Sequence, residues 1–450
     1  MIGWLWVGCG EPEATPGGAP TYYQDVAPVL ARRCGACHVD GGGAPFSVQD
    51  YPTAAAWAEV MVDAVESGRM PPYFAEETDE CEMRVGLRDD PRMTEDEEAL
   101  LAAWAAAGAP EGDPDAAAPA PVRPIDHLDA PDVTLTMTEP FEVSGDRDIY
   151  QCLRLALPPM DGDRWITGLE VLPDNDKVVH HVLVWNDPTD QSAVLGGGDD
   201  SYACSGFPGV WPTEIAGIWT PGADPTRAPL GAGTLVHPGA SLVLNIHYHP
   251  TGTTTETDRT QVAIEWTDTA PGQSATWFLV DLPFGAQTEP GPHDRSDSAE
   301  FRIPAGEPSH RETVALTIPD LIGLDLPIFA ITPHMHYLGS EMLVTLDHPD
   351  GSSDCLIHTP QYRFDYQTMY TYDAQQADLH TARVGDTVRV RCTYDNSADS
   401  RFMSDYLAAS GGAAPQDVYW GEQTEDEMCM AMVGLVLPPG DWLSLLGGLF

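Results

Sequence analysis

From about Asp132 onward, the chain alternates apolar and polar residues in short segments, and this pattern constrains the fold more than any other feature. Examples are "VTLTMT", "SLVLNIHYH" and "DTVRVRCTY", separated by Pro, Gly, Asp and Asn. A period of two places one face of each segment against a core, as in antiparallel β-sandwiches. Roughly 300 residues suit two sandwiches rather than one. We therefore predict all-β domains at residues 132–288 and 289–440, with a tail at 441–450.

The preceding region has helical spacing instead. The segments "YYQDVAPVLARRC" and "TAAAWAEVMVDAVESG" carry apolar residues at intervals of three and four. The segment "TEDEEALLAAWAAAG" opens with a capping box of Thr94 and Glu97 and stops at Gly108. A Pro- and Ala-rich linker follows at 113–131. We predict a small all-α domain at 21–112.

The N-terminal residues 1–20, "MIGWLWVGCGEPEATPGGAP", resemble the end of a lipoprotein signal with Cys9 as the lipidated residue. They lack a positively charged region, so an ordinary terminus stays open as the alternative. No run of apolar residues reaches the length of a transmembrane helix.

Cysteine usage indicates the compartment. Setting aside Cys9, Cys34 and Cys37 leaves an even number of cysteines, which suits disulfides in an oxidising space. We expect a periplasmic, cell-surface or secreted protein, with a lipid anchor if Cys9 is modified. The remaining cysteines are Cys81, Cys152, Cys204, Cys355, Cys392 and Cys429.

The chain is strongly acidic. Asp and Glu number 70 against 21 Lys and Arg, and the formal net charge is −49. Such a surface repels nucleic acid and anionic lipid, so we exclude both as partners. It would favour a cationic electron donor or substrate, or it keeps the protein solvated.

The motif "CGACH" comprises Cys34, Cys37 and His38. Its spacing lets two thiols attach one haem while the next imidazole reaches the iron. A thioredoxin-like pair would need a βαβ context, and a zinc site would need a second Cys/His pair nearby; the sequence has neither. Met70, in "SGRMPPY", can supply the second axial ligand. Together these features resemble a small class I cytochrome c.

Three histidine clusters and one methionine stand out in the β region: His180–His181, His247–His249, His334–His336 and Met428. Two histidines at positions i and i+2 of a strand share a face, whereas adjacent ones share a metal only where the strand is twisted or bulged. A thioether is a soft ligand that favours copper over zinc. Two His and one Met therefore indicate copper, and a cluster of imidazoles indicates a second site.

Four segments in this order resemble the copper type II monooxygenases, which include peptidylglycine alpha-hydroxylating and dopamine beta-monooxygenases: "VVHHVLVW", "IHYHP", "PHMHYLG" and "DEMC". The resemblance implies two antiparallel jelly-roll sandwiches with one copper each across a solvent-filled cleft. It places His180, His181 and His247 on an electron-transfer copper. It places His334, His336 and Met428, the catalytic set, on an oxygen-binding copper. His249, which lies beside a ligand position, is left out of the set.

The resemblance also implies a disulfide between Cys392 and Cys429, beside Met428. Cys152 matches a family cysteine whose usual partner is missing here, and we take Cys204 as its substitute partner. Cys81 and Cys355 are left unassigned.

The family hydroxylates a C–H bond with O₂ and takes electrons from ascorbate. Here we expect electrons to pass from the fused haem to the first copper and then to the second, with ascorbate as an optional donor. A cytochrome that merely shares the chain is the alternative. A separate redox protein could deliver electrons to the haem. The oligomeric state is left open.

The substrate is expected to be a small, apolar organic molecule. Peptide-cleaving relatives anchor a carboxylate with Arg, Asn and Tyr, where this chain has Thr332, Met430 and Met432. Two non-enzymatic alternatives stay open: a copper and haem electron carrier or copper-binding protein, and an adhesion-type sandwich.

Overall fold

The computed structural model describes residues 18–40, 44–118, 127–295, 298–319 and 323–442. The N-terminal segment with Cys9 and the tail beyond residue 442 lie outside these ranges. The protein consists mostly of β-sheet with few helices, which is compatible with β-sandwich domains. Among the described residues, no helix combines the length and apolar character needed to cross a bilayer.

The described residues divide into two compact units. The first consists of residues 18–40, 44–71 and 91–118, and it is helical. Its elements are η1 (Tyr22–Val26), α1 (Ala27–Arg33), α2 (Tyr51–Ala56), α3 (Ala58–Glu66), α4 (Glu95–Ala106) and η2 (Pro114–Ala116).

The predicted capping box begins α4. The Thr94 side chain accepts from the backbone N–H of Glu97, and the Glu97 side chain accepts from the N–H of Thr94. The same carboxylate also binds Arg33 of α1 over 3.0 Å, which ties the two helices together. Trp104 is fully buried at the centre of this helical core.

The second unit contains residues 72–90 as well as 127–442. We call residues 72–90 the arm, because this segment leaves the helical unit after Pro71 and returns to it at Pro91. The arm packs on the β region through Tyr73, whose ring lies 5.1 Å from that of Tyr370. The disulfide between Cys81 and Cys355 attaches it covalently.

The N-terminal sandwich packs a five-stranded sheet against four strands of a larger sheet. The five strands are, in spatial order, β6 (Ser201–Ala203), β3 (Ile149–Ala156), β10 (Ser241–Tyr248), β5 (Val179–Asp187) and β7 (Glu214–Trp219). The facing strands are β1 (Val133–Thr136), β12 (Gln261–Thr267), β4 (Arg164–Leu172) and β9 (Ala232–Val236), with β8 (Thr226–Arg227) on β4.

The C-terminal sandwich packs the rest of that larger sheet against a second five-stranded sheet. The continuation consists of β13 (Gln273–Val280), β24 (Met430–Leu437), β17 (Leu326–His334) and β20 (Tyr370–Thr371), with β21 (His380–Ala382) also on β17. The opposite sheet consists of β14 (Gln287–Thr288), β16 (His310–Thr317), β22 (Thr387–Tyr394), β18 (Gly339–Asp347) and β19 (Ser353–Thr359). The remaining elements are β2 (Phe141–Val143), β11 (Glu256–Asp258), β15 (Arg302–Ile303), β23 (Val418–Tyr419), α5 (Ser192–Leu195), α6 (Met403–Ser410), η3 (Pro229–Gly231), η4 (Leu282–Phe284) and η5 (Gln376–Asp378).

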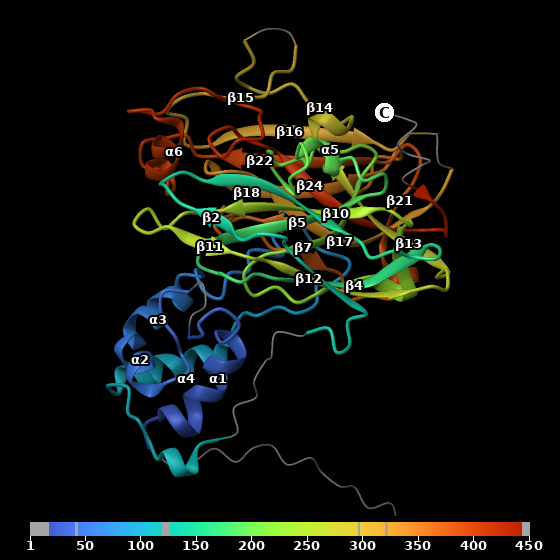
Figure 1. The fold of residues 1–450 in the computed structure, drawn as a ribbon. Helices are drawn as coiled ribbons and strands as arrows, with labels where there is room; N and C mark the ends of the chain where they lie inside the picture. Colours follow the sequence, from blue (N-terminus) through green and yellow to red (C-terminus); the bar gives the residue numbers. More distant parts are fainter. Residues whose placement is uncertain (1–17, 41–43, 119–126, 296–297, 320–322, 443–450) are drawn as a thin grey trace, which may run out of the picture. The chain divides into compact units, whose positions relative to one another are not determined.

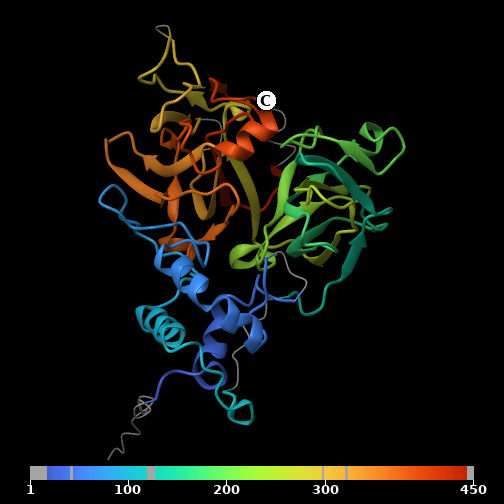
Figure 2. The ribbon, with the colours of Figure 1, turned by 90° about the vertical axis from the view of Figure 1, so that its left-hand side faces the viewer.

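One ten-stranded sheet therefore runs through both sandwiches (Figure 1). It is continuous because β13 pairs with β9 on one side and with β24 on the other. In Figure 2 the two sandwiches, green and orange, lie side by side. The interface between them is therefore connected by backbone hydrogen bonds.

Three disulfides stabilise the β region. Cys392 pairs with Cys429 and Cys152 with Cys204, as expected, and Cys81 pairs with Cys355. Because Cys392 lies in β22 and Cys429 directly precedes β24, their bond joins the two sheets of the C-terminal sandwich.

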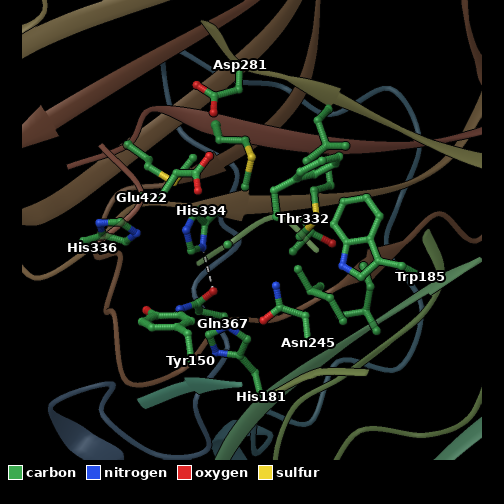
Figure 3. A pocket seen from close by; sticks show the side chains of 18 of the residues that line it. Tyr150, His181, Trp185, Asn245, Asp281, Thr332, His334, His336, Gln367 and Glu422 are labelled. Carbon is green, nitrogen blue, oxygen red and sulfur yellow. Dashed lines mark hydrogen bonds between the residues drawn. The ribbon is translucent and has the colours of Figure 1, made fainter. Parts of the chain in front are cut away.

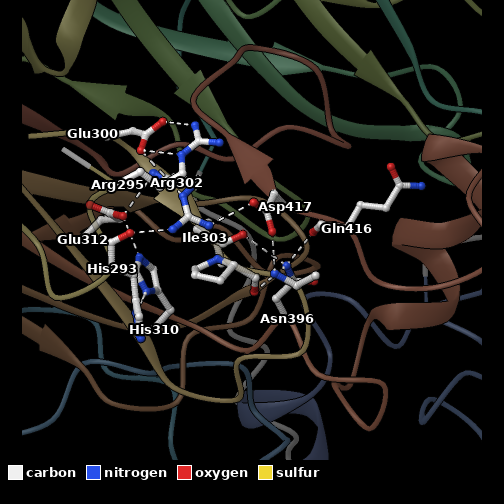
Figure 4. Close-up of polar contacts among 12 residues, drawn as sticks. His293, Arg295, Glu300, Arg302, Ile303, His310, Glu312, Asn396, Gln416 and Asp417 are labelled. Atoms are coloured by element: carbon white, nitrogen blue, oxygen red, sulfur yellow. Dashed lines mark hydrogen bonds and ion pairs between the residues drawn. The ribbon is translucent and has the colours of Figure 1, made fainter.

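A buried polar cluster anchors the start of the C-terminal sandwich (Figure 4). The Nε2 atom of His310 lies 2.6 Å from Glu312, and its Nδ1 atom lies 3.0 Å from His293. Arg302 binds Asp417 over 2.9 Å, which holds β15 beside β23. His310 and Glu312 are buried, so their contact satisfies polar atoms that burial would otherwise leave unpaired.

Candidate metal centres

The first histidine cluster lies at a β-bulge. Opposite β5, His247 of β10 pairs with His181, but the next residue, Tyr248, pairs with Val179. His180 is therefore the extra residue, and the bulge lets two adjacent side chains turn to the same side. The ligand atoms of His180, His181 and His247 all lie within 4.8 Å of one another, and the Nδ1 atoms of the first two are 3.1 Å apart.

The third histidine of this cluster is held on two sides. The His247 ring stacks on Tyr150 with a centroid distance of 4.4 Å, and its Nε2 atom lies 3.1 Å from Asp148. The same carboxylate binds the exposed His249 and accepts from the Tyr337 hydroxyl, over 2.7 and 3.1 Å. His247 and His249 thus contact the same carboxylate, so His249 supports the cluster through Asp148.

The cluster favours uncharged imidazoles. Burial is the main cause that lowers the pKa of His180 to about 3, and burial also lowers the pKa of His181 well below its usual value. Burial alone would raise the pKa of Asp148, but hydrogen bonds from His247 and His249 bring it below its usual value. Neutral rings keep a lone pair for a metal at neutral pH.

The second cluster lies on the pairing of β17 with β24. His334, the last residue of β17, stands opposite Met430, the first residue of β24, and His336 and Met428 lie just beyond these strand ends. The rings of His334 and His336 lie 5.1 Å apart. The predicted pair of imidazoles and the predicted thioether of Met428 line the same cavity.

Hydrogen bonds orient both rings of this cluster. The Nδ1 atom of His334 lies 2.7 Å from Oε1 of Gln367, and that of His336 lies 3.0 Å from the carbonyl oxygen of Asp426. Acceptors at Nδ1 place the proton there and leave Nε2 of each ring with its lone pair. Burial lowers the pKa of His334 to about 4 and that of His336 to about 3. This donor set suits a soft metal such as copper.

A cavity between the sandwiches contains members of both clusters (Figure 3). Its free volume is about 60 Å³, counted as the space that the centre of a water molecule can occupy. One wall is the face of β17 and β24 that carries Thr332, His334, Met430 and Met432. The other wall comes from the N-terminal sandwich and includes His181 and apolar residues of β5 and β7.

Phe364 lies between the two clusters. Its ring centroid is 5.5 Å from that of His180 and 6.1 Å from that of His336. It also contacts Tyr337, over 4.7 Å. The resemblance implied a solvent-filled cleft here, whereas the structure places an aromatic ring in contact with histidines of both clusters.

In the helical unit, the "CGACH" motif forms the turn after α1. The backbone N–H of His38 donates to the carbonyl of Cys34, so the motif residues share one helical turn. The His38 Nδ1 atom lies 3.0 Å from the carbonyl of Phe46, which leaves Nε2 available as a ligand. Cys34 and Cys37 belong to none of the three disulfides and stand as thiols. Met70 follows in the same unit.

Several residues around the clusters had no signal in the sequence. Asp148 stands far from any histidine motif in the chain, and Phe364 and Gln367 lie in a loop without periodicity. The sequence also did not predict that the arm packs on the β region, because no local pattern relates Cys81 to Cys355.

Comparisons with known proteins identify the part of the chain that holds the second cluster. Residues 303–434 match the family model described as copper type II ascorbate-dependent monooxygenase, C-terminal domain. No curated protein matches the chain. Among solved structures, the major capsid protein P2 from Bacteriophage PM2 is 8% identical over 68% of this chain and 98% of that chain, with a TM-score of 0.26. A structure of allantoicase is 11% identical over 55% of this chain and 77% of that chain, with a TM-score of 0.17. Similarities at this level carry no argument about fold or function. The matching region contains His334, His336 and Met428, so the part of the chain with the second cluster is similar to the C-terminal domain of that family.

Proposed function

We propose that the protein is a two-copper monooxygenase that hydroxylates a C–H bond of a small organic molecule with O₂. The observation that carries this proposal is the shared cavity, which His181 of the first cluster and His334, His336 and Met428 of the second all line. A cavity next to both ligand sets gives a substrate access to the centre that would bind oxygen.

The two donor sets support different roles. Three imidazoles from His180, His181 and His247 would hold an electron-transfer copper, and His334, His336 and Met428 would hold the oxygen-binding copper. When bound, the two ions would each supply one electron for the reduction of O₂. Burial favours the neutral form of the His180, His181, His334 and His336 rings, and their hydrogen bonds fix the orientation of the last two.

The walls of the cavity support a substrate with an apolar body. Leu183, Trp185 and Ile218 line one side, and Met430 and Met432 line the other. Thr332 and the two methionines stand where the peptide-cleaving relatives would hold a carboxylate, so a peptidylglycine is not the substrate we propose. A simple electron carrier has no need of such a cavity, which argues against the non-enzymatic alternative.

We further propose that the helical unit is a class I cytochrome c-like domain with one covalently bound haem. The fit rests on the two thiols, Cys34 and Cys37, and on the free Nε2 of His38. Met70 would be the second axial ligand. The haem would feed electrons to the first copper, with ascorbate as the alternative donor. Both β domains are proposed to be jelly rolls.

The proposed location is an oxidising compartment outside the cytosol. Three disulfides in the described residues support it, because thiols stay reduced in the cytosol. Covalent attachment of haem would also require export. Lipidation of Cys9 belongs to the same proposal.

The proposal is tested on full-length protein made with haem-maturation machinery and loaded with copper. We expect two coppers and one haem per chain, Cu–S scattering in X-ray absorption, and O₂ uptake coupled to a hydroxylated product. His336→Ala should abolish product formation. His249→Ala is the matched control, because His249 is exposed and outside both ligand sets. Zinc at full occupancy, or O₂ uptake equal in His336→Ala and the parent, would contradict the proposal.

A further inference from the structure

The loop between β19 and β20, residues 360–369, holds the second cluster in place but has no helix or strand of its own. Its Gln367 side chain lies 2.7 Å from Nδ1 of His334 (Figure 3). The Tyr362 hydroxyl donates to the carbonyl of Met335 over 2.7 Å and accepts from its N–H over 3.0 Å. A loop can position a metal ligand in this way only if its own ends are fixed.

The arm fixes the strand that precedes this loop. β19 is the last strand of its sheet, so its outer edge needs a partner, and the arm supplies one. The N–H of Glu76 donates to the carbonyl of His358 over 2.9 Å, and the Thr78 hydroxyl lies 2.8 Å from Nδ1 of the same residue. The disulfide from Cys81 joins the arm to Cys355 of this strand. The start of the loop is therefore attached to the arm.

The arm also fixes the strand that follows the loop. The Tyr73 ring lies 5.1 Å from that of Tyr370, and the Tyr370 hydroxyl accepts from the N–H of Phe74 over 3.2 Å. All three of these side chains are buried. The N–H of Arg88 donates to the carbonyl of Thr371 over 2.9 Å. Both ends of the loop are thus attached to the same segment.

Strand pairing by itself gives the end of the loop little support. β20 consists of Tyr370 and Thr371, which pair with Ile331 and Ala330 of β17. A strand of this length is far shorter than the usual five or six residues, so it contributes few hydrogen bonds. The packing of Tyr73 against Tyr370 adds a contact that this short pairing lacks.

We propose that the arm is a clamp that positions the second cluster. By holding both ends of residues 360–369, it keeps Gln367 against His334 and so raises the affinity of this cluster for its metal. The inference rests on the proposed function, because it takes the second cluster as a copper site. Tyr73 and Tyr370 are positioning residues, which act through Gln367.

The first test measures Cu(I) affinity in full-length protein without O₂, by competition with a chelator. Cu–S scattering in X-ray absorption identifies the second cluster. Tyr73→Ala removes the ring contact and should weaken Cu(I) binding at this cluster at least about tenfold, as expected when the support of a metal ligand is lost. The first cluster should change less. Tyr73→Phe keeps the ring and should retain most of the affinity.

A second variant removes one hydrogen bond of the clamp. Tyr370→Phe keeps the ring but leaves the N–H of Phe74 without its acceptor, so it should also weaken binding at the second cluster. Tyr51→Phe is the matched control, because its hydroxyl donates to the carbonyl of Ala109 within the helical unit. If Tyr73→Ala fails to fold, judged by thermal unfolding, Tyr370→Phe decides. Equal losses at both clusters, or no loss, overturn the inference.

A double-mutant cycle tests whether the clamp acts through Gln367. Gln367→Ala should itself weaken Cu(I) binding at the second cluster about tenfold. Adding Tyr73→Ala to this variant should cost less than about twofold more, because the two changes break the same chain of contacts. Losses that multiply in full overturn the proposed route.

Hydrogen exchange tests the clamp in the full-length chain without copper. Tyr73→Ala should increase exchange in residues 360–369 and leave that of β10 as in the parent. Parent-like exchange in the loop overturns the inference.

Affinity and turnover separate this inference from the proposed function. Weaker Cu(I) binding and faster exchange in the arm variants, with no hydroxylated product from the parent, support the clamp and count against the monooxygenase. Product from the parent, with unchanged affinity and exchange in the arm variants, supports the monooxygenase and overturns the clamp.

Discussion

The Glu427 carboxylate accepts a hydrogen bond from the backbone N–H of His336 over 2.9 Å, although the two residues lie on different strand ends. It also accepts from the N–H of Leu338 over 2.6 Å, and it is fully buried. Glu427 precedes Met428, so one carboxylate fixes the backbone on both sides of the second cluster. Burial raises the pKa of Glu427 to about 8, which means that the group is mostly protonated at pH 7.

The loss of stability on substituting Glu427 should therefore come from lost hydrogen bonds and not from lost charge. Glu427→Gln keeps one of the two acceptor oxygens and should cost about 1–3 kcal/mol, because the other backbone N–H then faces the amide nitrogen. Glu427→Ala leaves two buried N–H groups unpaired and should cost about 2–6 kcal/mol. Chemical denaturation measures both, and X-ray absorption should show loss of Cu–S scattering in the alanine variant alone. Equal losses in the two variants would assign the effect to charge instead.

Phe364 should control electron transfer between the two clusters. Its ring centroid lies 5.5 Å from that of His180 and 6.1 Å from that of His336, one residue of each cluster. Phe364→Ala should bind copper normally but slow transfer of the electron from the first site to the second. Phe364→Tyr, which keeps the ring, is the matched control. Stopped-flow reduction followed by trapping of each copper state gives the rate, and an unchanged rate in Phe364→Ala would remove Phe364 from the path.

The bond between Cys81 and Cys355 should hold the arm on the C-terminal sandwich. Replacing both cysteines by Ser removes a crosslink between residues 274 positions apart in sequence. The cost should be about 2–5 kcal/mol if the whole second unit unfolds cooperatively. Hydrogen exchange should increase first in residues 72–90. Protection there that matches the parent protein would mean that packing, such as that of Tyr73 on Tyr370, suffices.

The ligand pairs were predictable because their geometry is local. His334 and His336 line the same cavity, and the adjacent His180 and His181 required the bulge that the structure contains. The capping box at Thr94 is equally local. Copper itself was inferred from the softness of Met428 and from the family resemblance, and not from spacing alone.

The long-range features could not be predicted, because no short-range pattern encodes them. The pairing of β13 with β24 joins segments about 150 residues apart. Phe364 lies in an irregular loop, where sequence periodicity does not predict the direction of a side chain. Residues 72–90 read as part of the helical region, yet they pack on the β region.

Glu214 should make stability depend on pH. It is buried, accepts from the Thr276 hydroxyl over 2.7 Å, and burial raises its pKa to about 7 from an ordinary 4.5. Between these values the folded state holds a proton that the unfolded state has released, so stability falls as pH rises from 4.5 to 7. The effect should reach about 3 kcal/mol. Glu214→Gln should remove this part of the slope in denaturation curves, and an identical slope in the variant would contradict the assignment.

Activity driven by ascorbate should not need the proposed haem, whereas activity driven by a reduced redox protein should need it. Deleting residues 1–120 would be a poor test, because it would also remove Cys81 and the arm, which belong to the β unit. Cys34→Ala with Cys37→Ala removes both attachment points and leaves the arm and its disulfide in place. This double variant should lose covalent haem, keep two coppers and keep activity driven by ascorbate. Activity driven by a reduced redox protein should fall to background, measured as product formed with each donor in turn.

Equal rates with that protein in the parent and the double variant would mean that electrons reach the first copper without the helical unit. Loss of copper or of ascorbate-driven activity would instead mean that haem attachment supports the fold of the whole chain.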